Sequence, residues 1–342
     1  MEGPGQFGGI TDEDRRNIDG SEAVLGTEAT EQGRHTAGPE GTASYSTGEL
    51  EQALITFGGF GSEPGQFRFP RGVVVSPSNE IFVGDRGNRR VQVYSTWGVY
   101  LRHFPTVVPG SGGEKKMMPD DVCMDGNFTL WVVGNGGSDH HVVQYSTDGT
   151  ALLQFDLPVN TFVHGMAVDM RTNHILVTDG DRGEVQVFRP DGSLVRRIRL
   201  PRGKISCACY ITVDDEGNIL VSDRDTHSVY VYNDFGMRTL GGEGSGEGQL
   251  KDPRGICTDR AGNIIVADSQ KERVKIGNTG YITDVGAWNR RVQIFTCHGE
   301  FVRTVNCFSS TASDIDCLAV GLEGHLVVIN RWDHTVTVIT NY

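Results

Sequence analysis

The sequence predicts an all-β fold, a six-bladed β-propeller. A short run of alternating apolar and polar residues recurs six times along the chain, at a base spacing of about 44 residues. Further β-type runs accompany each copy. Four short strands in each unit of this length are typical of a propeller blade. A helical solenoid would repeat its apolar residues about every 3.6 positions, and the chain shows no such period.

The first two strands of each blade are predicted from runs of β-branched and apolar residues bounded by Gly, Asp or Asn. The expected first strands are 72–76, 121–125, 165–169, 210–214, 255–259 and 317–321. The expected second strands are 81–85, 130–134, 175–179, 219–223, 264–268 and 326–330. Short turns such as SPSNE, DEGN and RAGN join the two strands, which favours antiparallel hairpins.

The third and fourth strands follow along the chain in the same way. The expected third strands are RVQVY (90–94), VVQY (142–145), VQVF (185–188), VYVY (229–232), VQIF (292–295) and VTVI (336–339). The fourth strands of the first five blades are VYLRHF, ALLQF, LVRRI, MRTLG and FVRTV. The sixth copy ends after its third strand, whereas an unassigned strand, ALITFG (53–58), precedes the first copy. We therefore predict that residues 53–58 complete the last blade, which closes the ring and removes two open sheet edges.

One blade carries an insertion. The segment VADSQKERVKIGNTGYITDVGAWNRRVQIF (266–295) aligns with VGDRGNRRVQVY (83–94) once residues 271–288 are removed. Two segments, KERVKI (271–276) and 289–295, therefore compete for one strand position. We favour 289–295 because its aromatic end and the strand after it fit the repeat, and we expect 271–288 to be a long loop; an error of splicing or gene prediction is the alternative origin of this segment.

Charge and composition indicate two parts. The chain of 342 residues has a net charge of −13, and residues 1–52 hold eleven acidic and three basic side chains. We expect 1–52 to be a disordered acidic segment and 53–342 to be the propeller. The chain has no apolar run of about 18 residues and no signal peptide, so we expect a cytoplasmic protein without a membrane span. The seven cysteines show no CxxC spacing, which favours buried thiols over a metal site.

Two stretches carry a family resemblance. Residues 57–94 (FGGFGSEPGQFRFPRGVVVSPSNEIFVGDRGNRRVQVY) and 240–270 (LGGEGSGEGQLKDPRGICTDRAGNIIVADSQ) resemble NHL repeats, and the order of the blades resembles the C-terminal propeller of tripartite-motif (TRIM-NHL) proteins. Such proteins usually carry a RING finger, B-boxes and a coiled coil before the propeller. Residues 1–52 contain no cysteine, so no ubiquitin-ligase activity is assigned to this chain itself.

An aspartate ends the second strand in four blades. These residues are Asp85, Asp179, Asp223 and Asp268. Each precedes a tight turn into the third strand, and its carboxylate is placed to accept backbone N–H groups of that turn. Recurrence on several blades favours a structural role over a catalytic one.

Strand direction places the loop before the first strand and the loop between the second and third strands on one face, the top face. Candidate binding residues in these loops are Arg71, Arg86, Arg89, Arg182, Arg224, Arg254, Arg331 and His164. The turns of the opposite face are rich in acidic residues, so the top face is the expected recognition surface. The alternative is that these arginines pair with neighbouring aspartates and are merely solvated.

Three functions compete. The resemblance implies a non-catalytic scaffold, monomeric as an isolated chain, that presents its top face to partner proteins, as in substrate recognition by TRIM-NHL ubiquitin ligases. It also implies the alternative, binding of stem-loop or single-stranded RNA by the top-face arginines in post-transcriptional regulation, although acidic residues share that face and no aromatic-rich basic stripe is evident.

The third and most remote function is that of a zinc-dependent lyase acting on hydroxylated peptide glycines, because NHL-like propellers include such an enzyme. A zinc site of this kind needs several histidines around the central channel. The equivalent inner positions hold Arg71, Asp120, His164, Arg254 and Asp316, of which only one is histidine. We therefore expect no enzyme activity, no metal and no cofactor.

Overall fold

The computed structural model describes residues 53–110, 115–158, 161, 163–200, 208–269, 289–305 and 315–342. Residues Glu49–Tyr342 belong to one compact unit. The predictions of a disordered segment at 1–52 and of a loop at 271–288 fall on residues outside these ranges. Among the described residues, no helix is long and apolar enough to cross a membrane.

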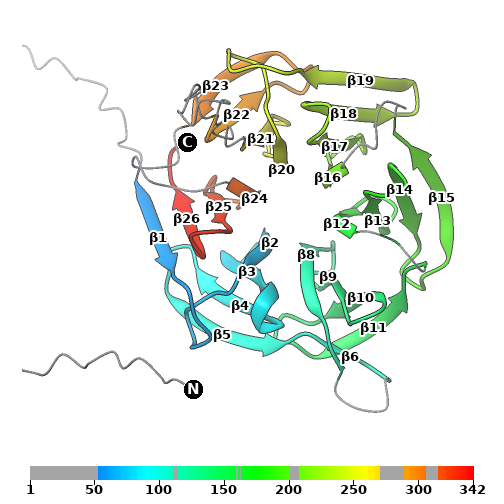
Figure 1. The fold of residues 1–342 in the computed structure, drawn as a ribbon, viewed down its shortest axis with the longest axis vertical. Helices are drawn as coiled ribbons and strands as arrows, with labels where there is room; N and C mark the ends of the chain where they lie inside the picture. The colour runs from blue at the N-terminus through cyan, green and yellow to red at the C-terminus, as the bar shows by residue number, and fades with distance from the viewer. Residues whose placement is uncertain are drawn as a thin grey trace, which may run out of the picture. The chain divides into compact units, whose positions relative to one another are not determined.

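Six antiparallel four-stranded sheets form a ring, as predicted (Figure 1). Their inner strands line a central channel. Blade 1 contains β2 (Pro70–Val75), β3 (Glu80–Asp85), β4 (Arg90–Ser95) and β5 (Tyr100–Pro105). Blade 2 contains β8 (Met118–Met124), β9 (Leu130–Asn135), β10 (His140–Tyr145) and β11 (Ala151–Asp156). Blade 3 contains β12 (Val163–Asp169), β13 (His174–Asp179), β14 (Glu184–Phe188) and β15 (Leu194–Arg199).

The remaining blades repeat this order. Blade 4 contains β16 (Ala208–Val213), β17 (Ile219–Asp223), β18 (Ser228–Asn233) and β19 (Gly236–Gly241). Blade 5 contains β20 (Pro253–Thr258), β21 (Ile264–Asp268), β22 (Arg291–Phe295) and β23 (Phe301–Val305). Blade 6 contains β24 (Ile315–Val320), β25 (Leu326–Asn330), β26 (Thr335–Ile339) and β1 (Leu54–Gly58). A short hairpin, β6 (Val107–Val108) with β7 (Lys115–Lys116), joins blades 1 and 2, and the turn η1 (Arg86–Asn88) joins β3 to β4.

The ring closes as predicted. Strand β1 pairs with β26 in antiparallel register from Leu54↔Ile339 to Gly58↔Thr335. The hydroxyls of Thr56 and Thr337 lie 3.0 Å apart across this pair. The first described strand of the chain therefore becomes the outer edge of the last blade, beside the C-terminal strand (Figure 1).

The choice between two segments for the third strand of blade 5 is also confirmed. Strand β22 pairs with β21 from Ile264↔Phe295 to Asp268↔Arg291. The side-chain amide of Asn289 donates to Asp268 Oδ2 over 3.1 Å, which fixes the start of this strand.

Each inner strand begins two or three residues earlier than predicted, because it contains a bulge. In blade 1 the pairing with β3 shifts between Pro70 and Val73, and Gly72 adopts φ = +71° at the bulge. A bulge places two residues opposite one and breaks the alternation of side chains. The sequence pattern is therefore regular only beyond the bulge.

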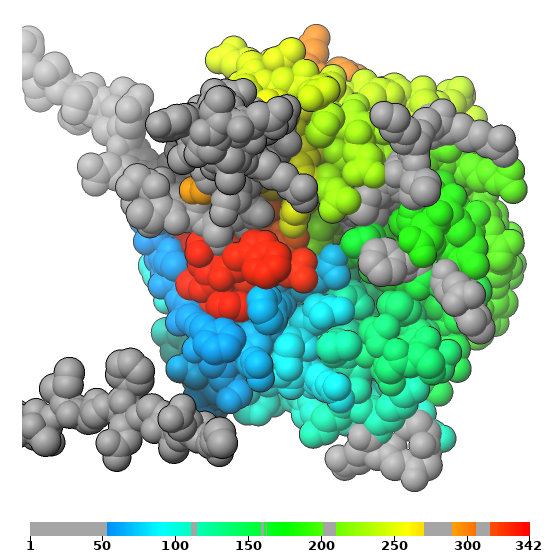
Figure 2. Space-filling view, viewed as in Figure 1, coloured from blue at the N-terminus to red at the C-terminus, as the bar shows by residue number. Residues whose placement is uncertain are grey.

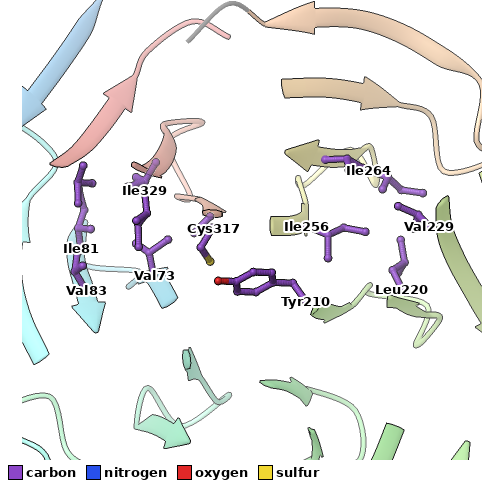
Figure 3. Packing of buried hydrophobic residues seen from close by; sticks show 14 of the residues in the cluster. Val73, Ile81, Val83, Tyr210, Leu220, Val229, Ile256, Ile264, Cys317 and Ile329 are labelled. Carbon is purple, nitrogen blue, oxygen red and sulfur yellow. The ribbon is translucent and has the colours of Figure 1, made fainter. Parts of the chain in front are cut away.

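The core lies between the blades. The central strands bury both faces; every residue of β17, β21 and β25 is buried. One cluster joins blades 4, 5, 6 and 1, and Figure 3 shows the Tyr210 side chain reaching from β16 across the centre towards Cys317 of β24. Burial on both faces explains why these strands read as continuous apolar runs.

Candidate interaction face

The predicted inner positions meet at the top of the channel. The Arg71 guanidinium donates from Nη1 to Asp120 Oδ1 over 3.0 Å and from Nη2 to His164 Nδ1 over 2.9 Å. Its Nε lies 3.7 Å from Asp316 Oδ2. Arg86 Nε donates to the same oxygen of Asp120 over 2.8 Å. Arg71 is only 9% exposed, so it is a structural member of this group rather than a free surface cation.

Asp316 anchors the other side of this group. It accepts hydrogen bonds from Arg254 Nη1 over 2.9 Å and from the Tyr210 hydroxyl over 3.0 Å. Although burial alone would raise the pKa of Asp316, the charges of Arg71, Arg254 and Arg331 hold that pKa below its usual value. We call the set Arg71, Arg86, Asp120, His164, Tyr210, Arg254 and Asp316 the channel-mouth network. Its members come from blades 1 to 6 and are joined to one another by hydrogen bonds and ion pairs.

A second buried carboxylate lies just below the network. Asp121 accepts the N–H groups of Val122 over 2.9 Å and Met166 over 2.8 Å. Burial raises the pKa of Asp121 to about 7, despite these hydrogen bonds and the nearby charge of Arg71. Beneath it, the inner strands line a pocket of about 250 Å³.

Two other predicted arginines lie farther from the channel and are paired with carboxylates. Arg182 Nη1 lies 2.5 Å from Asp179 Oδ2. Arg224 Nε lies 3.3 Å from Asp225 and 3.7 Å from Asp252. The two remaining arginines differ: Arg89 is exposed with φ = +55°, and Arg331 stacks over the Trp332 ring at 5.2 Å. The eight predicted residues share the top face, but their surroundings range from buried and paired to exposed.

The recurring aspartates act in two ways. Asp85 accepts the N–H of Arg68 over 2.8 Å and the Nε–H of Arg90 over 2.7 Å. Asp268 accepts the N–H of Lys251 over 2.7 Å in the same manner. In blades 1 and 5 the backbone donor therefore lies in the loop that enters the blade, not in the following turn as predicted. The sequence could not show this because the donor lies 17 residues upstream.

In blades 3 and 4 the aspartate caps its own turn, as predicted. Asp179 Oδ1 accepts the N–H of Arg182 over 3.3 Å. Asp223 Oδ1 accepts the N–H groups of Asp225 over 3.0 Å and Thr226 over 3.2 Å. Both arrangements have a structural role, because the carboxylates are fully buried.

An aromatic and basic cluster that the sequence reading missed lies on the top face, where blade 6 meets blade 1. We call it the aromatic seam; it consists of Phe60, Arg68, Phe69, Arg331, Trp332 and His334. The Phe69 ring lies 5.7 Å from Trp332 and 4.9 Å from His334. Figure 2 shows the red atoms of the last blade against the blue atoms of the residues that precede β2.

The sequence shows no aromatic-rich basic stripe, because the members of the seam come from two distant stretches of the chain. Phe60 and Phe69 lie 263–274 positions before Trp332 and His334 in the chain, so the four residues form no stripe in the sequence. A signal was available: alignment of the repeats places Phe60, Phe69 and Trp332 at positions where blades 4 and 5 hold acidic residues.

The part of the chain that the structure describes contains no candidate metal site. No group of three or more His, Cys, Asp or Glu side chains there lies close enough to hold a metal ion. His164, the one histidine at the inner positions, receives the hydrogen bond from Arg71.

Comparison with known proteins identifies the repeat. The NHL repeat family matches residues 67–94 and 161–188, which cover the first three strands of blades 1 and 3. Human E3 ubiquitin-protein ligase TRIM32 is 26% identical over 275 residues, 69% of this chain and 39% of TRIM32. Protein brain tumor of Drosophila melanogaster is 26% identical over 141 residues, 41% of this chain and 13% of that protein. Protein lin-41 of Caenorhabditis elegans is 35% identical over 112 residues, 27% of this chain and 10% of that protein. The chain thus spans about two-fifths or less of the length of these relatives.

Solved propellers share the architecture. Streptogramin B lyase superposes with a TM-score of 0.58 at 14% identity, covering 86% of this chain and 99% of the lyase. The WD40 propeller domain of Doa1 superposes with a TM-score of 0.53 at 12% identity, covering 80% of this chain and 79% of that domain. Similarity at such low identity shows the fold alone.

Proposed function

We propose that this chain, a six-bladed propeller with NHL repeats that is homologous to TRIM32, brain tumor and lin-41, is a non-catalytic scaffold that presents its top face to partner proteins. By analogy with TRIM32, a ubiquitin ligase by name, the partners would include substrates of ubiquitination. The chain would then supply recognition rather than the transfer of ubiquitin.

One observation carries this proposal: the charged groups at the channel mouth form hydrogen bonds and ion pairs with one another. Arg71, Arg254 and His164 are held by hydrogen bonds within the network. The top-face groups most open to a partner are therefore those of the outer loops, such as Arg68 and Arg89. An open surface on a rigid ring suits binding, since loops on a scaffold commonly carry recognition.

The test is affinity capture followed by mass spectrometry, with charge reversals that spare the network. The variant Arg68→Glu/Arg89→Glu changes two exposed top-face residues, and Arg260→Glu changes an exposed residue in the β20–β21 turn on the opposite face. We expect the captured proteins to be lost from the double variant and retained by Arg260→Glu. Identical capture by both variants would refute the proposal. Arg71 and Arg254 are unsuitable for such a test because reversal there would place a charge among buried carboxylates.

RNA binding is the second candidate, and the aromatic seam is the observation that favours it. Exposed rings stack on bases and arginines contact phosphates, which is how single-stranded RNA is commonly bound. Phe60 and Trp332 are 62% and 52% exposed, and Arg68 and Arg331 lie against their rings. A gel shift with a single-stranded oligonucleotide between about 50 and 200 mM salt tests it, because phosphate contacts weaken steeply with salt.

A further inference from the structure

The chain contains an internal control for the aromatic seam, because the junction of blades 4 and 5 has the same backbone. The His334 carbonyl accepts the N–H of Gly59 over 2.8 Å, and the His227 carbonyl accepts that of Gly242 over 3.0 Å. His334 Nδ1 accepts the N–H of Phe69 over 3.0 Å, and His227 Nδ1 accepts the equivalent N–H over 3.1 Å. Both entry loops are also closed by an isolated parallel bridge. The two junctions therefore share the same arrangement of backbone hydrogen bonds and histidine contacts.

The side chains at the two junctions have opposite character. The positions of Phe60, Phe69 and Trp332 correspond to Glu243, Asp252 and Asp225. We call the latter three residues the acidic seam. Since the same backbone forms with carboxylates in these places, the three aromatic side chains are not required by the local fold. Their clustering on the surface calls for a contact outside the blade.

The arginines also change partners. At the acidic seam, Arg224 lies 3.3 Å from Asp225 and 3.7 Å from Asp252. At the aromatic seam, the equivalent Arg331 stacks on Trp332 at 5.2 Å, and Arg68 stacks on Phe60 at 5.6 Å. Within the described part of the chain, neither Arg68 nor Arg331 forms a salt bridge, although the charge of Arg331 also acts on the buried Asp316. The exposed Arg68 and the half-buried Arg331 therefore offer charge-assisted hydrogen bonds to an external carboxylate beside an apolar surface.

The surroundings favour a short peptide over a nucleic acid. The exposed carboxylates of Glu63 and Asp333 flank Phe60 and Trp332 along the chain. A continuous phosphate backbone would be repelled by them, whereas a peptide can direct its own carboxylate to the arginines and its side chain to the rings. The seam places arginines beside aromatic rings, so it complements a peptide in which an acidic residue stands next to an apolar one.

We propose, resting on the scaffold function above, that the aromatic seam is the docking site for a segment of a partner protein in which an acidic residue adjoins an aromatic or large aliphatic anchor. The anchor packs among Phe60, Phe69 and Trp332. The carboxylate accepts hydrogen bonds from Arg68 and Arg331. Exposed aromatic and arginine side chains of this kind commonly dominate binding at protein interfaces.

The test replaces one seam by the other. The variant Phe60→Glu/Phe69→Asp/Trp332→Asp gives the blade 6–blade 1 junction the side chains that the chain already uses between blades 4 and 5. The control is Trp97→Asp, which alters a 71% exposed aromatic residue in the β4–β5 turn on the opposite face. Thermal melting establishes that each variant is folded. Should the triple variant fail to fold, Trp332→Ala takes its place, because Trp332 is half exposed and its removal leaves the backbone contacts of His334 intact.

A library of random twelve-residue peptides displayed on phage, selected on the wild-type propeller, supplies the probes. We expect the selected peptides to pair an acidic residue with an aromatic or leucine anchor. Synthetic copies should bind the triple variant at least about tenfold more weakly than the wild type, and should bind Trp97→Asp unchanged. Equal binding to the wild type and the triple variant, or selection of peptides without an acidic residue, would overturn the proposal.

Two further readouts separate this proposal from its alternatives. If a single-stranded oligouridylate loses binding in the triple variant while no acidic peptide is selected, the seam binds RNA and the peptide proposal is wrong. If the proteins captured by the propeller persist in the triple variant but are lost in Arg89→Glu, which leaves every seam residue unchanged, the scaffold function stands and the docking site lies elsewhere on the top face.

Discussion

At the scale of single residues, the same amino acid at the same repeat position has different partners. Asp85 ties the entry loop of its blade to the third strand, whereas Asp223 caps the turn that follows it. The repeat predicts that an aspartate is present and buried at the end of the second strand. It does not predict the donor, because the donor depends on the length and path of a neighbouring loop.

Asp85 should therefore contribute more to the stability of the fold than a residue that only caps its own turn. Its carboxylate is fully buried and joins Arg68, Asn88, Arg90 and Gln92. Replacing it by alanine leaves the largely buried Arg90 without its carboxylate partner, with only the carbonyls of Glu63 and Gln66 as acceptors, which should lower the free energy of unfolding by about 3–5 kcal/mol. Urea unfolding measures this loss. Arg182→Ala, which removes the exposed partner of Asp179, should cost about 1 kcal/mol or less; equal losses in the two variants would contradict the assignment.

Asp121 should make stability depend on pH. Its pKa is about 7 in the folded chain and 3.8 in the unfolded chain, so the folded state holds the proton more tightly. Stability from this group is present at low pH and declines as the pH rises from about 4 to about 7, by about 1.4 kcal/mol for each unit of pKa shift. Because Asn cannot ionise, Asp121→Asn should gain in unfolding free energy relative to the wild type between pH 5 and pH 8. A difference between the two proteins that is independent of pH would show that Asp121 is already ionised at pH 5.

At the scale of elements, the repeats predicted every strand of the six blades but not where the inner strands begin. The reason is the bulge near the top of each inner strand, where the alternation of side chains is interrupted. The bulge also brings neighbouring inner strands close together. A Cβ on Gly72 would lie 2.7 Å from the Asp121 Cα and from the Val122 nitrogen.

Gly72→Ala should consequently separate β2 from β8. The residue has φ = +71°, and the atoms it would meet are backbone atoms that cannot move alone. We expect a loss of about 1–3 kcal/mol in the free energy of unfolding, from conformational strain together with the close contact. The matched control is Gly126→Ala, whose Cβ would meet nothing within 4 Å and which should change stability by about 0.5 kcal/mol or less. Chemical denaturation of both variants measures the two changes in stability. Equal changes would show that the close approach of β2 to β8 at Gly72 does not limit the residue at this position.

At the scale of the whole molecule, the ring was predictable and the pairings across it were not. Counting the repeats gave six blades and the closing strand, because each blade carries its own local pattern. The channel-mouth network joins residues such as Arg71 and His164, 93 positions apart, and the aromatic seam joins residues from the two ends of the described chain. Such contacts depend on how blades meet, and no local pattern in the sequence reports that geometry.

Closure by β1 should hold this geometry together. Strand β1 covers the edge of β26 and half-buries Ile55 and Phe57 against the core that joins four blades. A chain that begins at residue 59 lacks this strand, whereas a chain that begins at residue 53 keeps it. Relative to the latter, we expect the shorter chain to lose on the order of 3 kcal/mol in unfolding free energy through the lost burial. It should also associate with itself as its concentration rises, because the exposed edge of β26 can pair with another chain. Thermal melting together with light scattering measures both effects, and a monomer of unchanged melting temperature would show that the ring does not depend on its closing strand.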